Sequence, residues 1–196
     1  MTKASTTRYT ILEKAFQLIY TKGYQTTSLD DILSTTEVTK GAFYYHFKNK
    51  DEMGVAIVEE ILKPMMQQAF IAPISTSINP LGDIYKMIHD LLLENQFLSI
   101  QHGCPVGNLT QEMTPWNGHF SKALSELTDS WQNALIDAVI RGKKAGKVKK
   151  TVVPEQVAYF IMSGYWGIRN FGKVENSDAC YRLYLKELKQ YLNNLE

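Results

Sequence analysis

The sequence is poor in several features that mark particular classes of protein. It has two cysteines in 196 residues, Cys104 and Cys180, too few and too far apart for a disulfide framework or the close ligand pairs of a structural metal site. No apolar run approaches the roughly 20 residues that a membrane span needs. The N-terminus is polar where a secretory signal peptide is apolar. We therefore expect a cytoplasmic protein with no membrane partner, no metal and no cofactor.

An excess of charge of one sign is also missing. The chain has 21 Lys and Arg against 20 Asp and Glu, which excludes a histone-like coat of charge and a polybasic membrane anchor. Residues 1–50, however, contain seven basic and four acidic residues, a net +3, and the remainder carries −2. A nucleic-acid surface must therefore be local, and the N-terminal segment is its expected place. A second basic run, residues 141–150, spans an expected helix C-terminus and the following loop. Cations there interact favourably with the helix dipole and with solvent, so the run need not bind nucleic acid.

What the sequence does contain is helical periodicity. The first helix has an apolar stripe and stops at Gly23. Ser28, with Asp31 three positions later, predicts the start of a short second helix, and Thr39 the start of a third over residues 40–47. Asn49 begins a fourth helix that links the first three to the rest of the chain. The stripe of the first helix consists of Ile11, Leu12, Ala15, Phe16 and Ile19.

The remainder is also expected to be helical. Residues 72–80 are the clearest predicted loop, because they are rich in Pro, Ser and Thr. Helices are expected over 81–97 and 116–144, over 154–171, which is apolar nearly all round, and over 177–195. The prediction is an all-α protein of about nine helices. A three-helix helix-turn-helix head occupies 1–50, and a helical effector-binding and dimerisation domain occupies 51–196.

Residues 23–53 carry the most specific motif. Gly-Tyr-x-Thr-Thr-Ser is followed, after the short helix, by Val-Thr-Lys-Gly-Ala-Phe-Tyr-Tyr-His-Phe-Lys-Asn-Lys-Asp-Glu-Met. This pattern resembles the tetracycline-repressor (TetR) family over about the first quarter of the chain. The resemblance implies a DNA-binding transcriptional regulator, not an enzyme, that acts as a homodimer. Family members of this kind are most often repressors released from a palindromic double-stranded DNA operator by a small-molecule effector.

The third helix supplies the residues expected to meet DNA. A helix in the major groove needs donors for base edges, and its flanks need groups for phosphates. Base reading is assigned to Lys40, Gly41 and Tyr44, and phosphate contact to Thr27, Tyr45, His46 and Lys50. Phe43 and Phe47 are expected in the core. His46 as a core or capping residue, and Lys50 as a solvated first-turn lysine, stay open as alternatives.

A dimer interface is expected on the last two long helices. Glycines allow close helix approach and leucines provide apolar area, and the resemblance implies a four-helix interface here. The residues assigned to it are Gly164, Gly167, Leu185, Leu188 and Leu192. The alternative is that the same stripes form the core of a single helical bundle.

The effector site is expected among the aromatic residues of the larger domain, since ligand cavities in bundles are apolar with a few polar groups. The candidates are Phe97, His102, Cys104, Trp116, Trp131, Tyr159 and Trp166. The segment Gly103-Cys104-Pro105 places a thiol at an expected helix start and resembles one in a TetR branch that includes sensors of quinones and other electrophiles. Cys104 is therefore either an inert core residue or, in an alternative function, the modified group of a redox or electrophile switch. A thiol-dependent enzyme is not favoured, because the sequence offers neither an acidic residue to orient a catalytic histidine beside Cys104 nor a cofactor motif.

Overall fold

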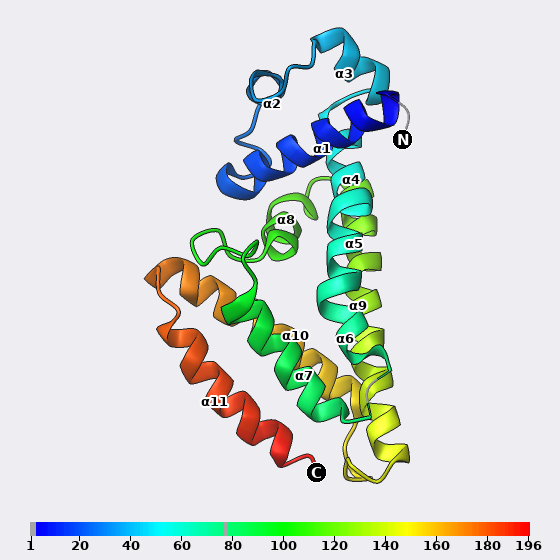
Figure 1. Cartoon of the computed structure of the whole chain (residues 1–196), viewed down its shortest axis with the longest axis vertical. Helices are drawn as coiled ribbons and strands as arrows, with labels where there is room; N and C mark the ends of the chain where they lie inside the picture. The colour runs from blue at the N-terminus through cyan, green and yellow to red at the C-terminus, as the bar shows by residue number, and fades with distance from the viewer. Residues whose placement is uncertain (1–2, 77) are drawn as a thin grey trace. The chain divides into compact units, whose positions relative to one another are not determined.

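The computed structural model describes residues 3–76 and 78–196, and its regular elements are helices (Figure 1). The N-terminal helices are α1 (Lys3–Lys22), α2 (Leu29–Ser34) and α3 (Lys40–His46). Five segments then follow without a break: α4 (Lys50–Ile57), η1 (Val58–Leu62), α5 (Lys63–Met66), η2 (Gln67–Ile71) and α6 (Ala72–Ser75). The last are α7 (Pro80–His89) with η3 (Asp90–Glu94), α8 (Pro105–Met113), α9 (Gly118–Lys144), α10 (Pro154–Glu175) and α11 (Ala179–Asn193). With contiguous segments joined, the described residues form nine helices, which confirms the predicted fold class.

The predicted helix boundaries in the head are confirmed in detail. Gly23 follows α1 with a φ of +96°, the left-handed conformation that glycine adopts without strain. Ser28 and Asp31 form a reciprocal capping box at the start of α2. Thr39 caps α3 and Asn49 caps α4, each through its side-chain oxygen.

The predicted loop over residues 72–80 is wrong in its first half, because the helix continues to Ser75 as α6. Pro73 lies in the first turn of α6, where a proline is tolerated since it needs no backbone N–H there. The earlier Pro64 has no N–H to offer the Glu60 carbonyl, and the five-residue hydrogen bonding of η1 ends beside it, with Lys63 N–H on Val58 O. Proline therefore reshapes this long helix without ending it.

The chain divides into two compact units. Unit 1 consists of the residues up to Pro64 together with Pro105–Ser125. In it α1 packs against α2, α3, α4 and η1. Phe43 and Phe47 are buried, as the sequence predicted, and they contact each other with ring centres 5.5 Å apart. The three-helix head therefore has a core of its own aromatic residues.

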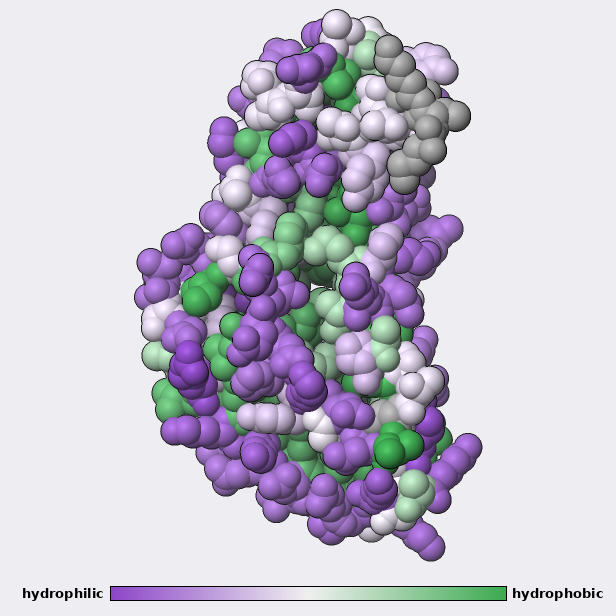
Figure 2. All heavy atoms as spheres, in the orientation of Figure 1, coloured by the Kyte–Doolittle hydropathy of each residue, from purple (hydrophilic) through white to green (hydrophobic). Residues whose placement is uncertain are grey.

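Unit 2 consists of Met65–Cys104 and Glu126–Glu196. In it α11 lies beside α7 and α10 (Figure 1). Trp131 is fully buried, with its ring edge-to-face against Phe70 and Tyr165 at 5.0 and 5.6 Å. Figure 2 shows that the surface is largely polar on the face viewed, with apolar side chains exposed in patches.

The side chains of the basic run at 141–150 bind backbone carbonyls within unit 2. Arg141, Lys143, Lys147 and Lys149 donate hydrogen bonds to backbone carbonyls at 2.5–2.7 Å. Carbonyls at helix ends and in loops need donors, and these side chains supply them. The run therefore has a structural role in which four of its six cations are engaged.

Candidate functional site

The exposed face of α3 is the candidate nucleic-acid interface. Lys40 and Gly41 are exposed, and Tyr44 is 51% exposed one turn after Lys40. Tyr45 beside them is 78% exposed. Phe43 and Phe47 point into the core and hold the helix, so the three predicted base-reading residues share a solvent-facing surface. A Cβ atom added at Gly41 would meet nothing within 4 Å, so this position leaves open space over the helix.

Two of the predicted phosphate contacts, Thr27 and Lys50, donate hydrogen bonds within unit 1. Thr27 is fully buried and its hydroxyl donates to the Gly23 carbonyl at 2.7 Å. Lys50 Nζ donates to the carbonyls of Tyr24 and Thr27 at 2.8 and 2.7 Å and lies 4.3 Å from the centre of the Tyr24 ring. Burial lowers the pKa of Lys50, and the neighbouring Asp51 carboxylate opposes that effect. The donors of Thr27 and Lys50 are thus engaged in the connection between α1 and α2.

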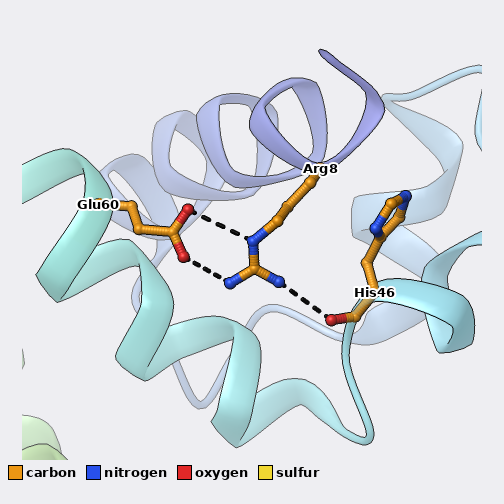
Figure 3. Close-up of polar contacts among 3 residues, drawn as sticks. All are labelled: Arg8, His46 and Glu60. Atoms are coloured by element: carbon orange, nitrogen blue, oxygen red, sulfur yellow. Dashed lines mark hydrogen bonds and ion pairs between the residues drawn. The ribbon is translucent and has the colours of Figure 1, made fainter. Parts of the chain in front are cut away.

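Arg8 joins three elements of unit 1, a feature that the sequence did not indicate. Its Nε and Nη2 donate to the two carboxylate oxygens of Glu60 at 3.3 and 2.5 Å, and its Nη1 donates to the carbonyl of His46 at 3.0 Å (Figure 3). The guanidinium also lies 4.3 Å from the centre of the Phe47 ring. Arg8 thereby links α1, the end of α3 and η1. Its partners are 38 and 52 residues away, so no local pattern reveals them.

A second link in unit 1 joins α8 to the end of α1. The Glu112 carboxylate accepts hydrogen bonds from the backbone N–H groups of Tyr24 and Gln25 at 2.9 and 2.6 Å. The Gln25 side chain donates in return to the Glu112 carbonyl at 3.1 Å. The Tyr24 hydroxyl donates to Asp51 at 2.7 Å, and burial first, then this carboxylate, raises the pKa of the phenol. The segment after α1 is therefore fixed from two sides.

The predicted effector residues are divided between the two units and differ in exposure. Trp116 is 79% exposed and belongs to unit 1, whereas the other candidates belong to unit 2. Tyr159 is also largely exposed, and Cys104 is 6% exposed. Phe97 is 39% exposed, and His102 and Trp166 are half-buried. Trp131 lies in an aromatic cluster with Phe70 and Tyr165. Helical spacing of aromatics does not reveal which face of each helix is buried, so the sequence could not predict these differences in exposure.

Arg169 is the group in unit 2 that sequence analysis missed. It lies on α10 and is fully buried. Its guanidinium donates to the carbonyls of Leu98, Ser99 and Gly103 at 3.4, 3.1 and 2.6 Å. Among the residues that the structure describes, no carboxylate lies within ion-pair distance of it. Polar residues in an apolar helix are a signal of such a site, and Arg169 is the one basic residue within 154–172.

The leucines assigned to a dimer interface are covered within the single chain. Leu185, Leu188 and Leu192 are 4%, 1% and 2% exposed, on the face of α11 that packs inside unit 2. The outward faces of α10 and α11 are apolar at other positions. A Cβ at Gly167 would meet nothing within 4 Å, whereas the space at Gly164 is filled by the Tyr184 ring. The exposed apolar residues of these two helices are Tyr159, Phe160, Phe171, Val174 and Leu183.

Family comparisons cover both units. Residues 11–57 match the family model described as bacterial regulatory proteins, tetR family. Residues 85–188 match the family model described as tetracyclin repressor-like, C-terminal domain. The second match alone spans more than half of the chain. Among the described helices, none combines the length and apolar character needed to cross a membrane.

Individual relatives agree with these matches. An HTH-type transcriptional regulator in the lacX 3′ region of Lactococcus lactis subsp. lactis is 34% identical over 131 residues, which cover 67% of each protein. The HTH-type transcriptional repressor DhaR of Mycobacterium sp. (strain GP1) is 24% identical over 175 residues, covering 87% of this chain and 84% of the relative. Both relatives are regulators of transcription by name.

Solved structures share the fold. The reduced form of Escherichia coli NemR superposes with a TM-score of 0.81 at 24% identity, covering 96% of each chain. A TetR transcriptional regulator from Chloroflexus aurantiacus superposes with a TM-score of 0.87 at 19% identity, covering 98% of this chain and 96% of its own. The exposed α3, the family matches and the shared fold agree: the chain belongs to the TetR family of bacterial regulatory proteins and is a DNA-binding transcriptional regulator of the helix-turn-helix type.

Proposed function

We propose that the protein is a homodimeric repressor that holds a palindromic operator through its 1–50 head and releases it when an effector binds the 51–196 domain. The observation that supports this most is the exposed face of α3, where Lys40, Gly41 and Tyr44 stand over a core of Phe43 and Phe47. Donors on such a face suit base edges in the major groove. Tyr45 and His46 flank it and are the remaining side-chain candidates for phosphate contact.

The experiment is fluorescence anisotropy with the DNA just upstream of the protein's own coding region, at several salt concentrations. Tyr44→Ala is expected to weaken operator binding by about 1–3 kcal/mol. Trp116→Ala, which removes an even more exposed aromatic side chain of unit 1, is the matched control and should bind as wild type does. Wild-type binding no tighter than to random DNA, at every salt concentration, would refute the proposal.

Dimerisation is part of the proposal because one head covers few base pairs. Two heads related by a two-fold axis occupy successive major grooves and read a near-palindrome. The outward faces of α10 and α11 are the proposed interface, since they leave Phe171, Val174 and Leu183 more than half exposed in the single chain. A Cβ added at Gly167 on α10 would meet nothing within 4 Å, so a second helix can approach closely at this position.

Release requires that effector binding favours a head geometry unsuited to the operator. We propose that α4 transmits the change from the effector-binding domain to the head. The continuation of α4, η1, carries Glu60, which is tied through Arg8 to α1 and the end of α3, while α8 is tied through Glu112 to the end of α1. A coupling of about 1–3 kcal/mol would change operator affinity about 5- to 150-fold.

A regulator switched by modification of Cys104 is the alternative. The thiol is 6% exposed, which disfavours attack on an electrophile in solution. Mass spectrometry after treatment with 1,4-benzoquinone tests this, with the half-buried Cys180 as an internal comparison. Selective, rapid modification of Cys104 accompanied by operator release, absent in Cys104→Ser, would establish the switch in place of a reversible ligand.

A further inference from the structure

Arg169 is a cation in the interior of unit 2. It is fully buried on α10, and no carboxylate of the described residues is within ion-pair distance. Three carbonyl oxygens in the non-helical segment after η3, those of Leu98, Ser99 and Gly103, accept its hydrogen bonds. Carbonyl dipoles solvate a cation only partly, so the charge itself is left uncompensated. Arginines buried in this way are usually paired with an anion.

The surroundings of Arg169 have donors to spare. Its Nε is buried with no hydrogen-bond partner among the described residues, and the same holds for the Tyr181 hydroxyl. Tyr181 is adjacent, with the guanidinium 5.7 Å from its ring centre. Burial raises the pKa of Tyr181, and the nearby Arg169 cation opposes that increase. What this region lacks is an acceptor, preferably a negatively charged one.

A cluster of aromatic side chains begins one helical turn from Arg169. Tyr165 lies one turn before Arg169 on α10, and its ring is edge-to-face with Trp131 and Phe70 at 5.6 and 5.5 Å. An anion that reaches Arg169 in this region would therefore have its remaining atoms against ring edges and faces. That environment suits an apolar or aromatic body and disfavours a second charge.

We propose that Arg169 is the recognition group for a small organic carboxylate with an apolar body, and that this is the effector class of the protein. The proposal rests on the effector-released repressor proposed above and names the ligand chemistry for it. The guanidinium binds a carboxylate through two parallel N–H···O bonds, and the Tyr181 hydroxyl donates a third. The carboxylate takes the place of the carbonyl oxygens that now occupy the guanidinium.

That exchange has a consequence for the chain between the two units. The Gly103 carbonyl, which makes the shortest of the three bonds at 2.6 Å, lies two residues before Pro105, where the chain leaves unit 2 and begins α8. When a carboxylate occupies Arg169, residues 98–103 lose their donor and are released. Helix α8 carries Glu112, so release of its N-terminal connection reaches the end of α1 through α8 itself and the hydrogen bonds that the Glu112 carboxylate accepts. The ligand and the loop carbonyls thus compete for one cation.

The test compares two acids with their neutral amides on the full-length protein. Benzoate and phenylacetate are titrated against benzamide and phenylacetamide, with binding measured by isothermal titration calorimetry and by the shift in Tm. The acids are expected to bind the wild type and the amides are not. Arg169→Met is expected to weaken acid binding about tenfold to a hundredfold, the loss typical of a charge-assisted hydrogen bond. Arg182→Met, which removes an exposed arginine of α11, is the matched control and should bind as wild type does.

Tyr181→Phe keeps the ring and removes the hydroxyl, so it tests the site even where Arg169→Met fails to fold. It is expected to weaken acid binding by about three- to tenfold. Equal binding of acids and amides to the wild type, unchanged binding by Tyr181→Phe and a folded Arg169→Met, or no binding of either acid would each overturn the proposal. Operator binding without any acid, measured on the same samples, shows separately whether the DNA-binding function stands.

Discussion

Arg8 and Glu60 lie 52 residues apart in sequence and form a two-point ion pair that joins α1 to η1. The third nitrogen of the same guanidinium binds the carbonyl of His46, the last residue of α3. One side chain therefore fixes the position of the helix that is proposed to read DNA relative to the helix that follows it.

Removing this pair should lower stability moderately. The side chains are 32% and 41% exposed, so solvent screening limits the coupling between them to about 0.5–1 kcal/mol. A double-mutant cycle of Arg8→Met and Glu60→Gln, followed by urea unfolding, measures it. The exposed pair of Lys86 and Asp90 in unit 2 is the control, with an expected coupling weaker than that of Arg8 and Glu60. Zero coupling between Arg8 and Glu60 would mean that the ion pair is not maintained in solution.

Gly41→Ala should affect DNA binding without harming the fold. The added methyl group meets nothing within 4 Å in the free protein, so the free energy of unfolding should stay equal or rise by up to about 1 kcal/mol. Operator affinity should fall at least about tenfold if the backbone of α3 approaches the bases closely, since the methyl group occupies that space. Gly118→Ala is the control, because its Cβ is equally unobstructed at the start of α9. Equal operator affinity of the two variants would remove Gly41 from the proposed interface.

The two faces of the C-terminal helices should respond differently to substitution. Val174→Asp, at a position 84% exposed in the single chain, is expected to raise the dimer dissociation constant at least about tenfold and leave the fold intact. Leu188→Ala, at a position 1% exposed, should instead lower the free energy of unfolding by about 2–5 kcal/mol. Sedimentation equilibrium and urea unfolding separate the outcomes. A Val174→Asp protein that stays dimeric at all concentrations would place the interface elsewhere.

The capping box of α2 should give stability that depends on pH. Hydrogen bonds from the Ser28 side chain and backbone lower the pKa of Asp31 in the folded protein. A carboxylate with a depressed folded pKa stabilises the fold above its unfolded pKa of about 4, and this contribution is lost as the pH falls through the folded value. The Tm of Asp31→Asn should therefore lie below that of wild type at pH 7 and converge with it at acid pH.

Asp30→Asn is the matched control for this comparison. It removes a carboxylate from the same first turn of α2, and Asp30 takes no part in the capping box. Its Tm difference from wild type should be smaller at pH 7. Equal effects of the two substitutions would assign the contribution to the helix dipole instead of the cap.

Local chemistry explains which parts of the structure the sequence could predict. The glycine stop at Gly23 and the caps at Ser28, Thr39 and Asn49 act within four residues, so their signals are present in short windows. The composition of residues 72–80 led to a wrong prediction of a loop over residues 72–75, because Pro73 is compatible with the first turn of a helix. Periodicity also identified the leucine stripe of α11. It could not indicate whether that stripe faces the same chain or a second copy, and in the single chain it faces α7 and α10.

The candidate site was predictable only where one helix carries it. Lys40, Gly41 and Tyr44 share a face of α3, and Phe43 and Phe47 oppose them, as spacing alone requires. The contacts of Lys50, Arg8, Glu112 and Arg169 join residues 23 to 88 positions apart. Such contacts follow from tertiary packing, so a lysine or arginine read as solvated or DNA-facing can be engaged with backbone carbonyls instead.

Unit 1 is built from two stretches of chain, and this matters while the protein is being synthesised. Glu112 and Phe120 complete the surroundings of Tyr24, with the Phe120 ring 5.0 Å from the tyrosine ring. A nascent chain that ends near residue 64 has all of α1, α2 and α3 but lacks this support. The head should therefore reach its final stability only after residue 125 has left the ribosome. A fragment of the first 64 residues, expressed alone, should accordingly be digested more easily by protease than the same residues within the finished chain.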